Sequence, residues 1–351
     1  MQELLLLQKK IIPELIEVLE KRYIILRAIY YNQPIGRRVL STKLGLGERI
    51  IRTETAFLKE QGLIEINTPG MSVTKDGEEL VEKLKGLMHE LKGLSNIEEI
   101  IKSYLGLKEV IIVPGSVEET DSVYKELGKA AANYLESIIK DNYIIALTGG
   151  NTIKEVVEAF PKINNISNTL IVPARGGMRG RVDIQSSTLA ESLAEKLNGS
   201  YKLLHIPERV SSELKFNLLK EREIKEVVDS IKKAHILIYG IGDAMIMAQK
   251  RDMPEEKINK LKELGAVGEA FGCYFDKNSK VVSENTTIGI NMKDARKINT
   301  HIAVAAGDNK IEAIIATMMN NENAVLITDE GSALKLESFI KEQQNNNSLK
   351  F

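Results

Sequence analysis

The chain has 351 residues, enough for two domains of ordinary size. Its 48 Lys and Arg residues nearly balance 49 Asp and Glu residues, for a formal net charge of -1, and 43% of the residues are hydrophobic. These values exclude a disordered chain and a uniformly basic protein. A single cysteine, Cys273, excludes an intrachain disulfide framework. The four histidines (His89, His205, His235 and His301) show no metal-ligand spacing, so no metal site and no cofactor are expected.

The first residues do not resemble a targeting segment. The leucine run at 4–7 is too short for the apolar part of a signal peptide and follows no basic residue. No other apolar run approaches the length of a membrane-spanning helix. We therefore expect a cytoplasmic protein with no membrane partner.

Positive charge is concentrated in residues 21–59. This window holds nine Lys or Arg residues against only Glu48 and Glu54, a net charge of +7. Such a run is often a solvated helix face, and the alternative is a surface for a polyanion. The pattern of the surrounding residues favours the second interpretation.

Three helices are predicted around this basic window. Apolar residues recur at helical spacing over 15–31, and Pro34 prevents continuation of that helix. A short helix over 36–44, a glycine-bearing turn and a third helix over 48–61 follow, and Gly62 closes the third helix. This order is typical of a helix-turn-helix.

The third helix separates its side chains by face. Ile51, Thr55 and Leu58 share an inner face, whereas basic side chains project from another face. A helix of this kind suits the major groove of DNA. We expect duplex DNA to be contacted by six residues of this region: Arg37, Arg38, Lys43, Arg49, Arg52 and Thr53.

A hairpin and a further helix complete the first domain. Residues 63–66 and 71–74 flank a Pro69-Gly70 turn and predict the wing of a winged helix. The helix predicted over 75–91 carries a leucine seam with 4-3-4 spacing, formed by Leu80, Leu84, Leu87 and Leu91. This seam would either pair two subunits or pack against its own domain, and two heptads do not separate these alternatives.

The glycine-bearing stretch at 93–96 marks the domain boundary. We expect a DNA-binding domain with its linker helix over 1–92, a ligand-binding domain over 93–342 and a flexible tail over 343–351. Strand-like runs alternate with helical stretches in the second domain, which predicts an α/β fold with a mainly parallel sheet. The expected strands are 110–113, 143–147, 169–172, 201–205, 236–239, 301–305 and 324–327.

Four segments at the expected strand ends are suited to an anion. Ligands of such sheets bind beyond the carboxyl ends of strands, where glycines expose backbone amides and helix N-termini add partial positive charge. The segments are 146–153, 173–178 with its arginine, 240–244 paired with 268–272, and 306–310 with its lysine. Each could be an ordinary turn, but together they favour a phosphorylated ligand.

Several motifs resemble a known family. The runs QPIGRR (33–38), ERIIR (48–52) and FLKEQGLI (57–64) are similar to the DNA-binding domain of SorC-type transcriptional regulators that control glycolytic genes. The runs PARGGM (173–178), GIGDA (240–244) and VLITDE (325–330) are similar to the sugar-binding domain of that family. The similarity covers nearly the whole chain.

The resemblance implies an effector domain related to phosphosugar isomerases and glucosamine-phosphate deaminases. We expect a homo-oligomeric repressor, dimeric or tetrameric, and an activator with the same parts is the alternative. The resemblance also implies a sugar phosphate as effector, namely fructose 1,6-bisphosphate. Carried over by motif, Gly149, Gly150, Asn151 and Thr152 would hold one phosphate with Lys310, although the family commonly has a hydroxyl residue where this chain has Asn151. The sugar or second phosphate would be held by Arg175, Gln185, Lys250, Arg251 and Glu269.

A related enzyme is the alternative function. Moving a proton between sugar carbons requires a carboxylate base and often a histidine. The acidic pair and the histidine of the deaminases are absent from the corresponding loops, which read Val172-Pro173-Ala174-Arg175 and 242–247. Asp243 and Glu269 remain as candidate acids. We therefore expect a regulator with no catalytic residues rather than a sugar-phosphate isomerase or deaminase.

Overall fold

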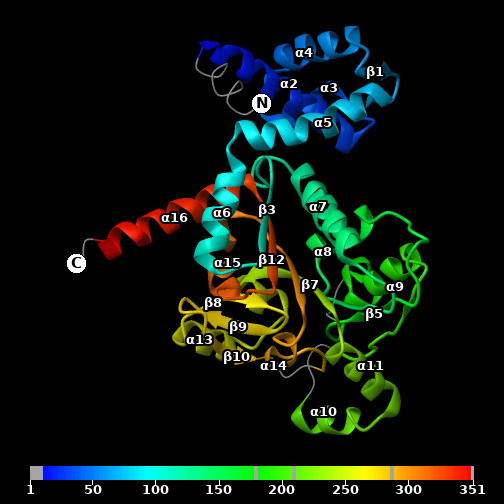
Figure 1. The fold of residues 1–351 in the computed structure, drawn as a ribbon, viewed down its shortest axis with the longest axis vertical. Coiled ribbons are helices and arrows are strands. Elements are labelled where there is room, and N and C mark those ends of the chain that lie inside the picture. Colours follow the sequence, from blue (N-terminus) through cyan, green and yellow to red (C-terminus); the bar gives the residue numbers. More distant parts are fainter. Residues whose placement is uncertain (1–10, 178–180, 208–210, 285–287, 349–351) are drawn as a thin grey trace. The chain divides into compact units, whose positions relative to one another are not determined.

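The computed structural model describes residues 11–177, 181–207, 211–284 and 288–348 (Figure 1). The chain divides into two compact units. The first contains the chain up to Ile97 together with Pro114–Val123, and the second contains Glu98–Val113 and the chain from Tyr124 onward. The chain therefore crosses between the units more than once.

The first unit is a winged helix-turn-helix. Its elements are α2 (Pro13–Asn32), α3 (Arg37–Leu44), α4 (Glu48–Glu60), the antiparallel strands β1 (Ile64–Asn67) and β2 (Gly70–Val73), and α5 (Lys75–Leu91). Proline stands in the first turn of α2, where its missing N–H costs no hydrogen bond. Gly45 ends α3 with φ of 61°, a left-handed conformation that favours glycine.

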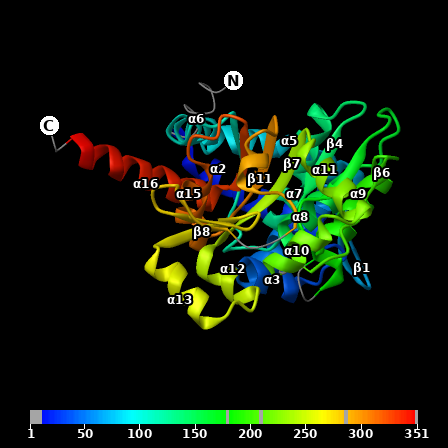
Figure 2. The ribbon, with the colours of Figure 1, turned by 90° about the horizontal axis from the view of Figure 1, so that it is seen from below.

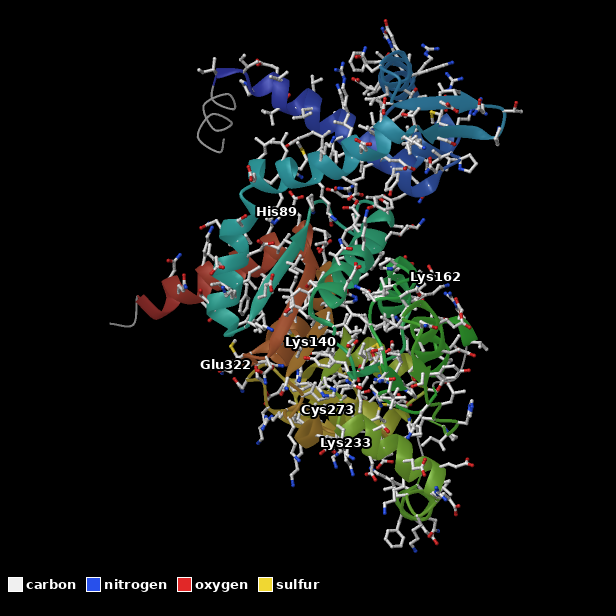
Figure 3. All side chains as sticks on the ribbon, turned by 45° about the vertical axis from the view of Figure 1, so that its right-hand side comes forward. His89, Lys140, Lys162, Lys233, Cys273 and Glu322 are labelled. Carbon is white, nitrogen blue, oxygen red and sulfur yellow. The ribbon has the colours of Figure 1, made fainter. Side chains whose placement is uncertain are left out.

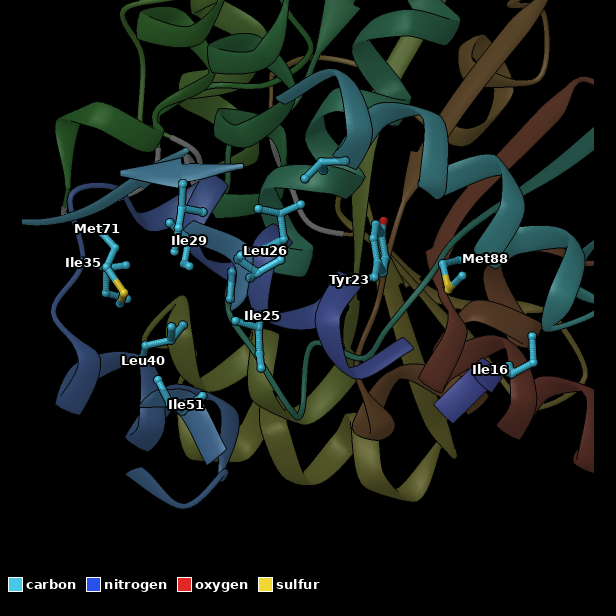
Figure 4. Packing of buried hydrophobic residues seen from close by; sticks show 14 of the residues in the cluster. Ile16, Tyr23, Ile25, Leu26, Ile29, Ile35, Leu40, Ile51, Met71 and Met88 are labelled. Atoms are coloured by element: carbon cyan, nitrogen blue, oxygen red, sulfur yellow. The ribbon is translucent and has the colours of Figure 1, made fainter. Parts of the chain in front are cut away.

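One apolar cluster holds the first unit together (Figure 4). Ile25, Ile29, Leu40 and Ile51 are completely buried and come from α2, α3 and α4. Met71 of β2 and Met88 of α5 close the same cluster. The hairpin and α5 are therefore integral to the DNA-binding unit.

The second unit is built on a mainly parallel sheet, as predicted. Its parallel strands are ordered β6 (Ser200–Tyr201), β5 (Leu170–Pro173), β4 (Ile144–Leu147), β7 (Ile236–Asp243), β11 (Thr300–Val304), β12 (Ala324–Asp329) and β3 (Glu109–Val113). Every residue of β12 is buried, which requires covering layers on both faces of the sheet. The expected strand at 201–205 is too long, because only Ser200 and Tyr201 pair with β5.

Helices cover this sheet and connect its strands. Those before β7 are α6 (Leu94–Leu105), α7 (Ser122–Ile138), α8 (Asn151–Ala159), α9 (Ser186–Lys196), α10 (Ser212–Leu218) and α11 (Arg222–Lys232), with a 3-10 turn η1 (Val182–Ile184). Those after β7 are α12 (Ala244–Lys250), α13 (Glu255–Glu263), α14 (Met292–Ala295), α15 (Ile311–Met318) and α16 (Glu330–Ser348), with η2 (Asp308–Lys310). Helix α16 extends into the segment expected to be a tail, and residues 349–351 of that segment lie outside the described residues.

An antiparallel extension was not expected from the sequence. Strand β7 continues to Asp243 and pairs antiparallel with β8 (Ala266–Ala270), which pairs with β9 (Cys273–Asp276) and then β10 (Val281–Glu284). Helices α12 and α13 lie on one side of β8 and α15 on the other (Figure 2). Much of 240–244 and 268–272, predicted to be loops, is therefore strand, because each segment supplies the other's backbone hydrogen bonds.

Cys273 lies among these strands (Figure 3). Its thiol is buried, and burial raises its pKa to about 12, with further contributions from Glu284 and Glu269. This cysteine is therefore a packed, protonated thiol. Across the described residues, no helix is both long and apolar enough to cross a membrane.

Candidate DNA-binding face and ligand site

Helix α4 has the two faces that the sequence predicts. Ile51, Thr55 and Leu58 are at most 2% exposed, whereas Arg49, Arg52 and Thr53 are exposed. The buried Thr55 hydroxyl donates to the Ile51 carbonyl at 2.7 Å, so a polar residue in the core leaves no unsatisfied donor. The outer face of α4 thus presents the basic side chains together.

Helix α3 adds the remaining residues of the predicted DNA-binding set. Arg37 and Arg38 are exposed in its first turn, and Lys43 is half-buried in its last turn. Helices α3 and α4 are in contact. Every residue expected to contact DNA therefore lies on this helix pair, although their contacts to DNA stay a prediction.

Other basic residues of the 21–59 window have structural partners. Lys21 and Arg22 both pair with the nearly buried Glu54, at 3.0 and 2.9 Å. Burial raises the pKa of Glu54, but the hydrogen bonds from Arg22 and Lys21 outweigh burial, so the net pKa is lowered. Arg27 donates to the Pro114 carbonyl at 3.0 Å. Part of the local positive charge therefore stabilises the fold.

The leucine seam of α5 packs against its own unit. Leu91 is 6% exposed, and Leu80, Leu84 and Leu87 are half-buried against the apolar cluster of the first unit. The structure thus contains one of the two alternatives that the sequence leaves open. The oligomeric state stays a prediction.

The candidate ligand site in the second unit begins at the turn between β4 and α8. Gly150 caps α8 with φ of 122°, a backbone conformation that favours glycine, and no side chain caps this helix. A Cβ on Gly149 would lie 2.5 Å from the Ile184 carbonyl oxygen, so only glycine fits there. Asn151 is exposed and Thr152 is half-buried in the first turn. The backbone amides in the first turn of α8 form a helix N-terminus suited to phosphate.

A buried charge cluster lies beyond the end of β5. Glu269 Oε1 lies 3.4 Å from Arg175 Nη1 and 3.1 Å from Arg251 Nη2, and it accepts a hydrogen bond from the Gly272 amide. Arg251 also donates to the Tyr274 hydroxyl at 3.4 Å. Each of these charged side chains is at most 6% exposed. Two guanidinium groups therefore converge on one buried carboxylate oxygen, and guanidinium groups suit the oxygens of a phosphate.

Two further contacts bring the β5 segment toward the β4 turn. The Ser186 hydroxyl donates to the Arg175 carbonyl at 2.9 Å, and the Gly150 amide donates to the Ile184 carbonyl at 2.9 Å. Gln185 lies between Ile184 and Ser186 in the chain, and its side-chain amide donates to the Arg181 carbonyl at 3.2 Å. The structure therefore brings Gly149, Gly150, Arg175 and Gln185 into one region. Met178, from the motif at 173–178, lies outside the described residues.

The remaining predicted ligand residues stand apart from this cluster. Lys250 is exposed at the end of α12, although its neighbour Arg251 is buried. Lys310 is half-buried in η2, which follows β11 and contacts β7. Because β7 lies between β4 and β11, the Lys310 turn and the Gly150 turn occupy the same edge of the sheet.

Sequence reasoning missed a charged group beside the β4 turn. Asp183 of η1 pairs with Lys154 of α8 at 2.7 Å and with Arg181. Hydrogen bonds from Arg181 and Lys154 hold the pKa of Asp183 far below its usual range. The sequence shows charged residues at 181 and 183, but no local pattern indicates that Asp183 pairs with the distant Lys154. These contacts fasten η1, and with it Gln185, to α8.

The candidate acids are occupied by structural contacts. Asp243 caps α12 by accepting from the Ile246 amide at 2.8 Å, and Glu269 pairs with both buried arginines. His235 accepts from the Ile144 amide at 2.9 Å. Burial lowers the pKa of His301, although hydrogen bonds to backbone carbonyls oppose this shift. These arrangements suit ligand binding better than proton transfer.

Comparisons with protein families divide the chain in the same order. Residues 18–88 match the "CggR N-terminal DNA binding domain", and residues 89–336 match the "Putative sugar-binding domain". The central glycolytic genes regulator of Bacillus subtilis (strain 168) is 41% identical over 336 residues, covering 96% of this chain and 99% of the relative. The same-named protein of Priestia megaterium is 41% identical over 337 residues, covering 96% and 98%.

Solved structures agree with these matches. A SorC family transcriptional regulator from Enterococcus faecalis is 33% identical with a TM-score of 0.64, covering 69% of this chain and 99% of that chain. The full-length sorbitol operon regulator SorC from Klebsiella pneumoniae has a TM-score of 0.65 at 20% identity, covering 90% and 97%, and shares the fold. The chain therefore belongs to the SorC family of transcriptional regulators, with a DNA-binding domain followed by a sugar-binding domain.

Proposed function

We propose that the protein represses glycolytic genes by binding operator DNA through α3 and α4, and that fructose 1,6-bisphosphate in the second unit releases or remodels that complex. The relatives named as central glycolytic genes regulators support the choice of target genes. The observation that carries the effector proposal is the buried cluster in which Arg175 and Arg251 share Glu269. It lies near the glycine turn before α8.

The ligand contacts follow from this geometry. The backbone amides in the first turn of α8, at Asn151 and Thr152, hold one phosphate with Lys310, while Gly149 and Gly150 shape the turn and the Gly150 amide bonds the Ile184 carbonyl. Arg175, Gln185, Arg251 and Glu269 hold the sugar or the second phosphate, and Lys250, which the structure does not bring to this cluster, stays a predicted contact. A bisphosphate would supply an anion at each place, and this geometry supports a bisphosphate over a free sugar as the effector.

The test is an operator titration with the full chain. Promoter fragments of glycolytic genes from the source organism are titrated in the presence of fructose 1,6-bisphosphate, fructose or neither. We expect a preference for such a fragment over random DNA, and weakened binding with the bisphosphate alone. Equal binding to random DNA would overturn the repressor proposal, and equal effects of fructose and its bisphosphate would overturn the phosphate contacts.

An isomerase or deaminase is the alternative function of this fold. The occupied carboxylates Asp243 and Glu269 argue against it. Sugar-phosphate interconversion followed by NMR should remain at background. Turnover above background by the folded parent protein would favour the enzyme.

We also propose a homo-oligomer, dimer or tetramer, in the cytoplasm. The seam residues Leu80, Leu84 and Leu87 are half-buried in one chain and retain apolar surface for a second chain. Light scattering on the full chain tests this state directly. A monomer at micromolar concentration, with and without DNA, would contradict it.

A further inference from the structure

Arg27 is a buried charged residue of the DNA-binding unit. It lies on α2 and is 4% exposed, and its guanidinium lies 5.6 Å from the Tyr23 ring centroid. Its Nη1 donates to the Pro114 carbonyl at 3.0 Å. A buried charge is costly without polar partners, so this contact is part of how the first unit folds.

The residue after Pro114 is shaped to fit Arg27. Gly115 has φ of 97°, which favours glycine. A Cβ at Gly115 would lie 2.7 Å from Arg27 Nη2 and 3.3 Å from Val123 Cγ2. The segment Pro114–Val123 is therefore packed closely within the first unit, to which it belongs by its contacts.

The same segment is continuous with the second unit at both ends. Pro114 directly follows Val113, the last residue of β3, and Val123 lies in the first turn of α7. Helix α7 continues without interruption into the second unit from Tyr124. A displacement of β3 or α7 therefore acts on a segment that contacts Arg27.

A line of contacts connects β3 to the Lys310 turn. Val113 lies opposite Asp329 in the parallel pairing of β3 with β12. Asp329 is fully buried, and its Oδ1 accepts from the Ser332 amide at 3.0 Å. The Ser332 hydroxyl accepts from the Gly307 amide at 2.9 Å. Gly307 caps η2, which carries Lys310.

We propose that this line, from Gly307 through Ser332, Asp329 and Val113 to Arg27, is the route by which ligand binding alters DNA binding. The proposal rests on the proposed function, because it requires a phosphate at the Lys310 turn and an operator at α4. A phosphate bound at the Gly307–Lys310 turn shifts that turn and so alters the Gly307–Ser332 hydrogen bond. The change moves the end of β12, where Asp329 lies opposite Val113. Arg27 then transmits the change to α2, which packs against α4.

Coupling is a free energy that acts equally in both directions. Spatial continuity alone does not establish it, so the coupling must be measured in variants of each end. For the full chain, dissociation constants are measured for operator with and without fructose 1,6-bisphosphate, and for fructose 1,6-bisphosphate with and without operator. The coupling factor is the ratio of the two operator dissociation constants, and the ratio of the two effector dissociation constants gives the same value.

Three variants interrupt the line, and two matched variants do not. Arg27→Met and Gly115→Ala alter the contact with Pro114, and Ser332→Ala removes the acceptor for the Gly307 amide. Lys83→Met removes an exposed cation of α5 whose partner is Glu79 of the same helix, and Ser338→Ala removes an exposed hydroxyl of α16 that donates to Leu334. The controls therefore also remove a cation and a hydroxyl, but at positions outside the proposed line of contacts.

We expect the coupling factor to fall at least about fivefold in the three interrupting variants. Operator affinity without effector and effector affinity without operator should each stay within about threefold of the parent, and both controls should keep the parental factor. If Arg27→Met does not fold, Gly115→Ala and Ser332→Ala decide the outcome. A parental factor in folded variants that bind both ligands would overturn the route. A parent that binds both ligands without coupling would overturn the proposed function itself.

Discussion

The guanidinium of Arg251 lies 3.1 Å from the Glu269 carboxylate, and the two side chains are only 4% and 3% exposed. Arg175 approaches the same carboxylate oxygen from β5 at 3.4 Å. Two buried guanidinium groups therefore converge on one carboxylate oxygen. This arrangement fixes both guanidinium groups before any ligand binds.

Replacing Glu269 by Gln should destabilise the second unit. The substitution removes the carboxylate charge that both buried guanidinium groups contact, and breaking a buried pair costs about 3–5 kcal/mol. Urea unfolding at neutral pH measures this loss. Added inorganic phosphate should restore more stability to the variant than to the parent. Identical unfolding midpoints for variant and parent would show that the cluster does not contribute to stability.

Gly149→Ala should weaken effector binding and destabilise the turn. Its Cβ would lie 2.5 Å from the Ile184 carbonyl oxygen, so the segment before Gln185 must move. Gly240→Ala is the matched control, because its nearest neighbour, the Val304 carbonyl oxygen, would be at 3.8 Å. Calorimetric titration with fructose 1,6-bisphosphate should separate the two variants. Equal affinity in both would argue against a ligand at this turn.

Arg49→Ala or Arg52→Ala should weaken operator binding by about 1–3 kcal/mol if the side chain reads a base. Lys59→Ala, near the other end of α4, should have a smaller effect because the N-terminal residues of a recognition helix contact the bases. Band shifts at several salt concentrations measure both effects. If only Lys59→Ala reduced operator affinity, the C-terminal end of α4, rather than its N-terminal end, would contact the bases.

The pairing of Glu54 with Lys21 and Arg22 should make stability depend on pH. Because the folded-state pKa of Glu54 is lowered from 4.5, its stabilising contribution is complete above pH 4.5 and is lost as pH falls through the folded value. Glu54→Gln should lose about 1 kcal/mol at pH 7 and lack this acid-dependent step. Thermal unfolding between pH 3 and pH 7 compares the two proteins. If the variant lost stability with falling pH just as the parent does, the loss would come from carboxylates other than Glu54.

The sequence predicts the regular elements of the DNA-binding unit closely. Residues 48–61 were expected to form a helix, and α4 spans Glu48–Glu60, because apolar spacing and Gly62 are local signals. The sequence does not predict that Lys21, Arg22 and Arg27 make structural contacts within the first unit. Their partners Glu54 and Pro114 are distant in sequence, and periodicity carries no information about such pairs.

The second unit shows the same limit. Parallel strands with apolar runs, such as β12, are recognisable in the sequence. The antiparallel strand β8 contains Gly268 and Glu269 and therefore reads as a loop. Its pairing with β7 brings Glu269 beside Arg175 and Arg251, so the central feature of the candidate site depends on a tertiary contact.

The most direct test of the account compares the parent with Lys310→Ala in operator titrations with and without fructose 1,6-bisphosphate. Lys310 is half-buried in the η2 turn of the second unit and lies far in sequence from α4. Losing a charge-assisted contact to phosphate costs about 1.5–3 kcal/mol, which is about tenfold to over a hundredfold in effector affinity. The account predicts that Lys310→Ala binds operator like the parent but stays bound at effector concentrations that release the parent. Release of both proteins at the same effector concentration would contradict it.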